Sequence, residues 1–258
     1  MEHIQLGTLI QFGGDAVYEA QYKGEKCIVK FSNTEREYRP AHLEGVVTSL
    51  LEPTGLVPRV LCNLSDIQHV EDDEIFTHAL VLEYISGHTL DTLRGISVAT
   101  SRSLCLEIVE GLAVIYSYGI VHNDLKLDNI MLDGERAKFI DFGCSYDVAY
   151  WKLMEEYSIQ HEHSDTPEYD AEVSRLERFV QNLDLICTPP ICDMEDSISH
   201  PDSFSLQQEY RQLVTRCLVP LISLAGDIEG QRRISSLEHT TKLSTILREV
   251  TRLANLSS

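Results

Sequence analysis

The spacing of the apolar positions changes partway along the chain. From Gly7 to Leu82 the apolar residues form short runs rich in Val, Ile, Tyr and Phe between turn residues, as β-strands do. The runs "AVYEAQY" and "KCIVKF" flank Lys23-Gly24-Glu25, which predicts an antiparallel hairpin. A helix is predicted from about Pro40 to Glu52, and "RVLCNL" and "HALVLEY" predict two further strands.

Beyond Gly87 the apolar residues recur at helical spacing. The segment "TSRSLCLEIVEGLAVIYSYG" predicts one long helix that ends near Gly119. Its apolar face carries Leu104, Ile108, Leu112, Ile115 and Tyr116. Near the end of the chain, Ser235 and Glu238 fit a capping box ahead of a second apolar stripe. That stripe is formed by Leu243, Ile246, Leu247, Val250 and Leu253. The pattern therefore predicts an α+β protein whose second part is a helical bundle.

Length and composition indicate a globular chain. With 258 residues, of which 43% are hydrophobic and 24% charged, one domain of two lobes is expected. No apolar stretch reaches the roughly 20 residues that cross a bilayer, and Glu2 does not fit a secretory signal. The seven cysteines form an odd set without a CxxC pair, so we expect them to be reduced and mostly buried. These features predict a cytoplasmic or nuclear protein without a membrane segment.

The net charge of −20 restricts the choice of partners. It disfavours direct contact with nucleic acid, whose backbone is also negative. The segment 155–209 has 14 Asp or Glu residues against Arg175 and Arg178. Two interpretations remain open, a solvated acidic surface and a docking site for a basic partner or substrate. The sequence leaves the oligomeric state open.

The candidate chemistry lies in a short polar loop. In "HNDLKLDN", Asp124, Lys126 and Asn129 stand at offsets of zero, two and five, and Asp141 follows 17 residues after Asp124. Phosphoryl transfer requires a group that orients a hydroxyl, oxygen ligands for Mg²⁺ and positive charge beside the phosphates. Asp124 suits the first role, Asn129 and Asp141 the second, and Lys126 the third.

This loop resembles the HRDLKxxN catalytic loop of the eukaryotic protein kinase superfamily, and Asp141-Phe142-Gly143 resembles its DFG motif. The resemblance implies a bilobal kinase-like fold. Residues 1–85 would form the N-lobe, an antiparallel sheet with one helix, and residues 86–258 the mainly α-helical C-lobe. It also implies ATP and Mg²⁺ as cofactors and, from the lysine of "DLK", phosphorylation of Ser or Thr hydroxyls of a protein substrate.

The same resemblance assigns residues upstream. Lys30 in "CIVKF" resembles the strand lysine of the VAIK motif and requires a carboxylate from the following helix, which we assign to Glu44. Glu35, Glu37 and Glu52 are the alternatives. The segment "LEYISG" resembles the hinge between lobes, where the backbone around Glu83, Tyr84 and Ile85 would hold adenine. The candidate catalytic residues are thus Lys30, Glu44, Asp124 and Lys126. The candidate nucleotide-binding residues are Gly13, Gly14, Val17, Lys30, Glu83, Ile85 and Lys126.

The chain departs from the family pattern at its glycine-rich loop. If Val17 is the valine of GxGxxGxV, the three glycine positions are Ile10, Phe12 and Asp15. Gly13 and Gly14 still allow a tight turn whose backbone amides approach a phosphate. Asp15 adds negative charge near a polyanion, so we expect weakened nucleotide binding.

Two further departures concern regulation and the substrate. Asn123 replaces the arginine of HRD, so the site is not expected to depend on a phosphorylated activation loop. Either Thr166-Pro167-Glu168 matches the APE motif or Asp170 matches the buried aspartate of the next helix, but the two are too close for both.

Three alternatives to a protein kinase follow from the same residues. "FGGDAVYEA" is similar to the loop of the small atypical kinase and ATPase of the KEOPS complex. The HxDxxxxN skeleton also occurs in small-molecule phosphotransferases of the aminoglycoside and choline kinase type, where Lys126 is not typical. The altered glycine loop fits a nucleotide-binding pseudokinase scaffold.

Overall fold

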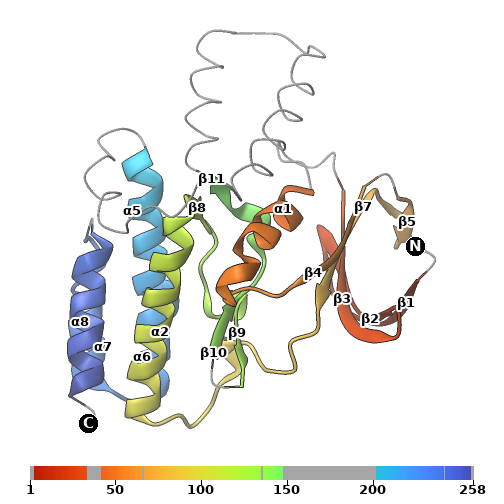
Figure 1. Cartoon of the computed structure of the whole chain (residues 1–258). Coiled ribbons are helices and arrows are strands. Elements are labelled where there is room, and N and C mark those ends of the chain that lie inside the picture. Colours follow the sequence, from red (N-terminus) through yellow and green to blue (C-terminus); the bar gives the residue numbers. More distant parts are fainter. Residues whose placement is uncertain are drawn as a thin grey trace, which may run out of the picture.

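The computed structural model describes residues 3–33, 42–65, 67–134, 136–147, 202–240 and 242–256. Strands form the first part of the chain and helices most of the second (Figure 1). This change from strands to helices is the one that the apolar spacing predicts, and the arrangement is the bilobal α+β fold that the family resemblance implies. No helix in these ranges is long and apolar enough to cross a membrane.

A five-stranded antiparallel sheet forms the N-lobe, in the order β1-β2-β3-β7-β4. Its strands are β1 (Ile4–Gly13), β2 (Asp15–Tyr22), β3 (Glu25–Ser32), β4 (Val60–Leu64) and β7 (His78–Glu83). The predicted hairpin is confirmed: Tyr22 pairs with Glu25 across Lys23 and Gly24, both of which have positive φ. Two such residues form the tight turn whose twist matches that of the strands.

The two faces of this sheet have different surroundings. Alternate residues of β2, β3 and β7 point to one face and form a buried apolar cluster with Phe76. Phe76 belongs to a small hairpin of β5 (His69–Glu71) and β6 (Glu74–Phe76). The intervening residues point to the other face. There Lys30 lies opposite Val17 on β2 and Leu80 on β7.

Helix α1 (His42–Leu51) connects this second face to the C-lobe, and it lies between the sheet and the C-lobe strands in Figure 1. It agrees with the helix predicted near 40–52, and the 3₁₀ turn η1 (Glu52–Thr54) follows it. Leu51 at its end is fully buried in the C-lobe core. Glu44 in its first turn faces the sheet, where it meets Lys30. One helix therefore contacts both lobes.

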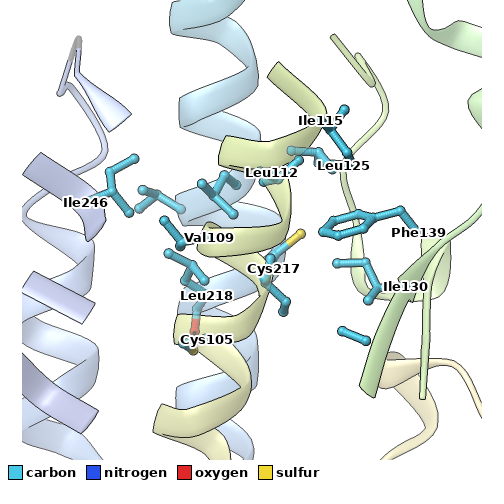
Figure 2. Close-up of a cluster of buried hydrophobic side chains, with 14 of the residues drawn as sticks. Cys105, Val109, Leu112, Ile115, Leu125, Ile130, Phe139, Cys217, Leu218 and Ile246 are labelled. Carbon is cyan, nitrogen blue, oxygen red and sulfur yellow. Dashed lines mark hydrogen bonds between the residues drawn. The ribbon is translucent and has the colours of Figure 1, made fainter. Parts of the chain in front are cut away.

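Helix α2 (Val98–Ser117) is the centre of the C-lobe core. Ser97 caps its start by accepting the amide of Thr100, and Gly119 with φ +75 follows its end, as predicted. The residues around it come from all sides of the lobe (Figure 2): Val109 and Leu112 of α2 lie among Ile246, Leu218 and Phe139. The predicted apolar face of α2 is buried along its whole length.

Short strands and turns carry the polar loop between α2 and the following helices. They comprise η2 (Leu90–Thr92), β8 (Ile120–Val121), η3 (Leu127–Asn129), β9 (Ile130–Asp133), β10 (Arg136–Phe139), η4 (Phe142–Cys144) and β11 (Tyr146–Asp147). β9 pairs with β10 and β8 with β11, both antiparallel. The loop therefore lies between two small ribbons that hold its ends.

The remaining helices pack beside α2 (Figure 1). They are α5 (Asp202–Gln212), the π-helical segment η6 (Leu213–Leu218), α6 (Val219–Leu224), α7 (Ile228–Ser235) and α8 (Leu243–Asn255). The predicted apolar stripe of α8 is confirmed, with Leu243, Ile246, Val250 and Leu253 buried. The predicted capping box is wrong, because Ser235 ends α7 and Lys242 precedes α8. Glu238 instead forms an ion pair with Arg211 of α5.

The cysteines within the described residues are free thiols. Cys27, Cys105 and Cys217 are buried, whereas Cys62 is half-buried and Cys144 is exposed. The three buried cysteines act as small core residues, which is consistent with the predicted reduced state.

Candidate active site

Lys30 is the centre of a cluster of charges between the lobes. Its Nζ lies 2.6 Å from Asp141 Oδ1, 2.8 Å from Glu44 Oε2 and 3.2 Å from Asp15 Oδ2. Glu44, the glutamate assigned to Lys30, lies at the lysine, whereas the alternatives Glu35 and Glu37 lie outside the described residues. Three segments far apart in the sequence, the β1–β2 turn, α1 and the stretch before η4, thus converge on one ammonium group.

The carboxylates keep this lysine charged. Burial would lower the pKa of Lys30, but Glu44, Asp141 and Asp15 outweigh it and raise its pKa well above the ordinary value. In the same way burial would raise the pKa of Asp141, and Lys30 overcomes this effect and lowers it. Both groups are therefore ionised at neutral pH.

The polar loop brings Asp124, Lys126 and Asn129 together. Asn129 donates from Nδ2 to Asp124 Oδ2 at 3.0 Å and to the Asp124 carbonyl at 2.9 Å. Lys126 Nζ lies 3.2 Å from Asp124 Oδ2. These contacts orient the Asp124 carboxylate from one side, and both donors of the Asn129 amide point at Asp124. The Oδ1 of Asn129 is then the atom that can face a cation.

Asp141 and Asn129 offer an oxygen set that fits Mg²⁺. Mg²⁺ prefers hard oxygen ligands and is commonly held by one or two carboxylates together with substrate phosphates. A carboxylate and an amide oxygen meet this requirement, and Asn129 is almost fully buried, which fixes its position. Within the described residues no group of three or more His, Cys, Asp or Glu side chains forms a closed metal site. The oxygen donors of Asp141 and Asn129 match the chemistry of a metal that is shared with a phosphate ligand.

His122 joins the polar loop to the segment of Asp141. Its Nε2 lies 3.0 Å from the carbonyl of Ile140, and its ring packs on Phe142 at 4.7 Å between centroids. Burial lowers the pKa of His122, so the ring is neutral. A neutral ring that faces a carbonyl must carry its proton on Nε2, which leaves Nδ1 to accept the amide of Asp124 at 3.4 Å.

Two residues of the site have left-handed backbone conformations. Asn123 and Asp141 both have φ of +62°. Short polar side chains tolerate this region better than arginine or branched residues do, which gives a local reason for asparagine at position 123. Its Nδ2 donates to the carbonyl of Cys144 at 3.3 Å, so Asn123 links the polar loop directly to η4.

Three polar residues on one face of α5 and η6 contact the polar loop. Glu209, Gln212 and Arg216, here called the loop clamp, lie three and four residues apart on α5 and η6. Glu209 accepts the amides of His122 and Asn123, and Gln212 accepts the amide of Leu125 at 3.0 Å. Arg216 Nη1 lies 3.1 Å from Asp124 Oδ1. The loop clamp thus binds the polar loop over four consecutive residues.

The loop clamp is absent from the sequence-based assignment. Its signal was present, because Glu209 stands beside Leu206, Tyr210 and Leu213 on the buried side of an amphipathic helix. A charged residue there requires partners, and Glu209 has three, including the Tyr116 hydroxyl at 2.9 Å. Burial raises the pKa of Glu209 to about 7.

The alternatives considered for the family pattern, Thr166-Pro167-Glu168 and Asp170, lie outside the described residues, as does most of the acidic segment 155–209.

Three of the nucleotide-binding candidates lie on the β1–β2 hairpin, next to the strand that carries Lys30. Gly13 and Gly14 have φ of +148° and +86°, and Gly13 pairs with Asp15, so they form the tight turn expected for the glycine loop. Val17 lies directly across from Lys30 on the face of the sheet that looks toward α1. These residues therefore form the N-lobe side of the site.

The hinge candidates follow the end of β7. Glu83 Oε1 lies 2.6 Å from Lys138 Nζ of β10, and its Oε2 is 2.7 Å from Arg59 Nε. The Glu83 amide donates to the Arg59 carbonyl at 2.9 Å, so this donor is already used. The adenine assignment therefore depends on the remaining backbone groups around Ile85, whose side chain is buried.

Comparison with known proteins agrees with this geometry. A family model described as the protein kinase domain matches residues 59–173, which include the polar loop and Asp141 but neither Lys30 nor Glu44. The chain is 33% identical over 113 residues to serine/threonine-protein kinase PknG of Mycobacterium leprae, covering 38% of this chain and 15% of that protein. It is 28% identical over 171 residues to human receptor-interacting serine/threonine-protein kinase 1, covering 61% of this chain and 21% of that protein.

The chain therefore spans less than a quarter of the length of these two relatives. Among solved structures, the kinase PK-1 of the Cydia pomonella granulovirus is 20% identical, with a TM-score of 0.45. That similarity covers 57% of this chain and 53% of the viral kinase chain.

Proposed function

Because the chain belongs to the eukaryotic-type protein kinase superfamily, we propose that it transfers the γ-phosphoryl group of ATP to Ser or Thr hydroxyls of protein substrates. One observation carries the proposal: Lys30 of the sheet contacts Asp141, on the segment that His122 joins to the loop of Asp124, Lys126 and Asn129. Groups that bind phosphate and a group that orients a hydroxyl are thus held in a single site, as phosphoryl transfer requires.

Each residue has a role that suits its surroundings. Asp124 accepts the proton of the acceptor hydroxyl or orients it, while Asn129 and Lys126 hold its carboxylate. Lys30, kept charged by Glu44, binds the nucleotide phosphates. Asn129 and Asp141 would hold Mg²⁺, which neutralises charge on the phosphate oxygens when bound.

Two features support the finer parts of the proposal. Lys126 beside Asp124 favours protein Ser/Thr kinases over small-molecule phosphotransferases, and the relatives described above bear the name serine/threonine-protein kinase. The contact of Asn123 with the Cys144 carbonyl links the loop to η4 without a phosphate group. We therefore expect activity that does not depend on activation-loop phosphorylation.

The test is a phosphorylation assay with the purified chain. Radiolabelled ATP and Mg²⁺ are supplied with Ser/Thr peptides of basic, neutral and acidic composition and with a panel of aminoglycosides and small alcohols. Asp124→Ala should lower turnover on the order of 10²–10⁴-fold while ATP binding is retained. Asp91→Asn, an exposed change on η2, is the control for the loss of one negative charge. The proposal would be refuted if no peptide became labelled, or if Asp124→Ala labelled the peptides as fast as wild type does.

A nucleotide-binding scaffold without transfer is the second candidate. The observation that favours it is the contact of Asp15 with Lys30, because it opposes phosphate binding. A ligand that binds only the folded state raises the melting temperature. Stabilisation by Mg·ATP without transfer to any acceptor would support the scaffold, whereas release of phosphate without an acceptor would support an ATPase of the KEOPS-like type.

A further inference from the structure

The turn between β1 and β2 places a carboxylate on the lysine that the proposed function assigns to the nucleotide. Asp15 stands at one of the three positions where the family pattern has glycine, and its Oδ2 lies 3.2 Å from Lys30 Nζ. Glu44 and Asp141 form ion pairs with the same ammonium group. Among the described residues, Lys30 is therefore one cation surrounded by three anions.

These three contacts use the hydrogen-bonding capacity of the lysine. An ammonium group has three N–H donors and no acceptor, and three carboxylates lie within 3.2 Å of it. A phosphate oxygen can reach Lys30 only if one carboxylate moves away. The approach of a phosphate is further opposed by the negative charge that the cluster carries in excess of Lys30.

Asp15 is the carboxylate best able to leave. Its contact with Lys30 is the longest of the three, and its side chain is 35% exposed, whereas that of Glu44 is 8% exposed. Gly13 and Gly14 precede it, and both have positive φ, a region in which glycine moves without steric cost. The Asp141 side chain is 43% exposed, but its contact with Lys30 is the shortest of the three, at 2.6 Å, and is a direct hydrogen bond. A small change in the β1–β2 turn is therefore sufficient to release Lys30.

We infer that Asp15 sets the affinity of the site for the nucleotide phosphates by occupying Lys30 until a polyphosphate replaces its carboxylate. The inference rests on the proposed function and adds a residue that determines affinity. Its ligand class is a nucleoside polyphosphate with a divalent cation. Adenosine, which has no phosphate, does not compete with Asp15 for Lys30.

The difference between adenosine and its phosphates gives the experiment. Calorimetric titration of the full chain with adenosine, Mg·ADP and Mg·ATP is compared for wild type, Asp15→Asn and Asp15→Ser. Both variants remove the charge, and Asn retains the shape of the side chain. An ion pair with one partly exposed partner contributes about 1 kcal/mol, so Mg·ADP and Mg·ATP should bind roughly five-fold more tightly to the variants. Adenosine affinity and the kcat at saturating ATP should stay unchanged, while the KM for ATP falls.

Asp73→Asn is the matched control. It makes the same change of charge in the same lobe, in the turn of the β5–β6 hairpin, which covers the opposite face of the sheet. Its φ of +65° is tolerated by Asn as well as by Asp. This variant should bind all three ligands as wild type does.

The outcomes separate the inference from the proposed function. Unchanged or weaker binding of Mg·ATP by Asp15→Asn overturns the inference, and so does an equal gain in affinity for adenosine, which would mean a change in cleft shape. An equal gain with Asp73→Asn overturns it as well, since net charge would explain the effect. If wild type and both Asp15 variants bind no Mg·ATP, the proposed function and the inference fail together.

Discussion

The buried carboxylate of Glu209 predicts a specific dependence of stability on pH. Glu209 is fully buried, and burial raises its pKa from 4.5 to about 7. Between these two values the folded protein keeps a proton that the unfolded chain releases, so the free energy of unfolding falls as pH rises. A shift of this size corresponds to about 3 kcal/mol, reached above pH 7.

Glu209→Gln removes this titration while it keeps the size of the side chain. The variant also presents an amide nitrogen in place of one of the carboxyl oxygens that face the amides of His122 and Asn123, which gives a constant offset in stability. The informative quantity is therefore the change in the difference between wild type and variant with pH. Between about pH 5.5 and 8.5 the variant should gain about 2 kcal/mol relative to wild type.

Urea denaturation at intervals across this range measures the difference, because other titrating groups contribute equally to both proteins. Glu110→Gln, an exposed change on α2, is the control for net charge. A wild-type-minus-variant difference that stays constant with pH would refute the reasoning. In that case Glu209 would titrate alike in the folded and unfolded states, and burial would not govern its pKa.

Three further predictions test the charge cluster and the loop clamp. Lys30→Met leaves the buried Glu44 without its cation and should lower the free energy of unfolding, measured by urea denaturation, by about 3–5 kcal/mol. Adding Glu44→Gln to this variant should recover much of the loss. A Lys30→Met variant as stable as wild type would contradict the pairing. Asp141→Asn should weaken the binding of Mg·ATP but not of adenosine in calorimetry, and equal losses for both ligands would argue against a metal at this residue. Gln212→Ala removes the acceptor of the Leu125 amide and should lower kcat with little change in the KM for ATP. The control is Gln208→Ala, an exposed change on the same helix, which should have the kinetics of wild type. Identical kinetics of the two variants would show that the polar loop keeps its conformation without Gln212.

Local sequence determined most of the helices and strands. The turn at Lys23 and Gly24, the helix near 42–51 and the long helix before Gly119 all follow from short-range spacing, and each agrees with its prediction. The capping box at Ser235 failed because Glu238 meets Arg211, a residue distant in the sequence. Local rules describe which conformations a segment prefers, and a tertiary contact of similar energy can override them.

The spacing of Asp124, Lys126 and Asn129 in the polar loop, with Asp141 17 residues after Asp124, was sufficient to predict a phosphoryl-transfer site, because this combination of side chains at this spacing has few other uses. Which groups complete the site was decided by the tertiary structure. The sequence left four glutamates as partners for Lys30, and only the packing of α1 between the lobes places Glu44 there. Glu209, Gln212 and Arg216 lie more than 80 residues after the loop that they bind, so no local pattern relates them to it. Spacing along a chain specifies neighbours within an element, whereas contacts between elements depend on how their buried faces pack.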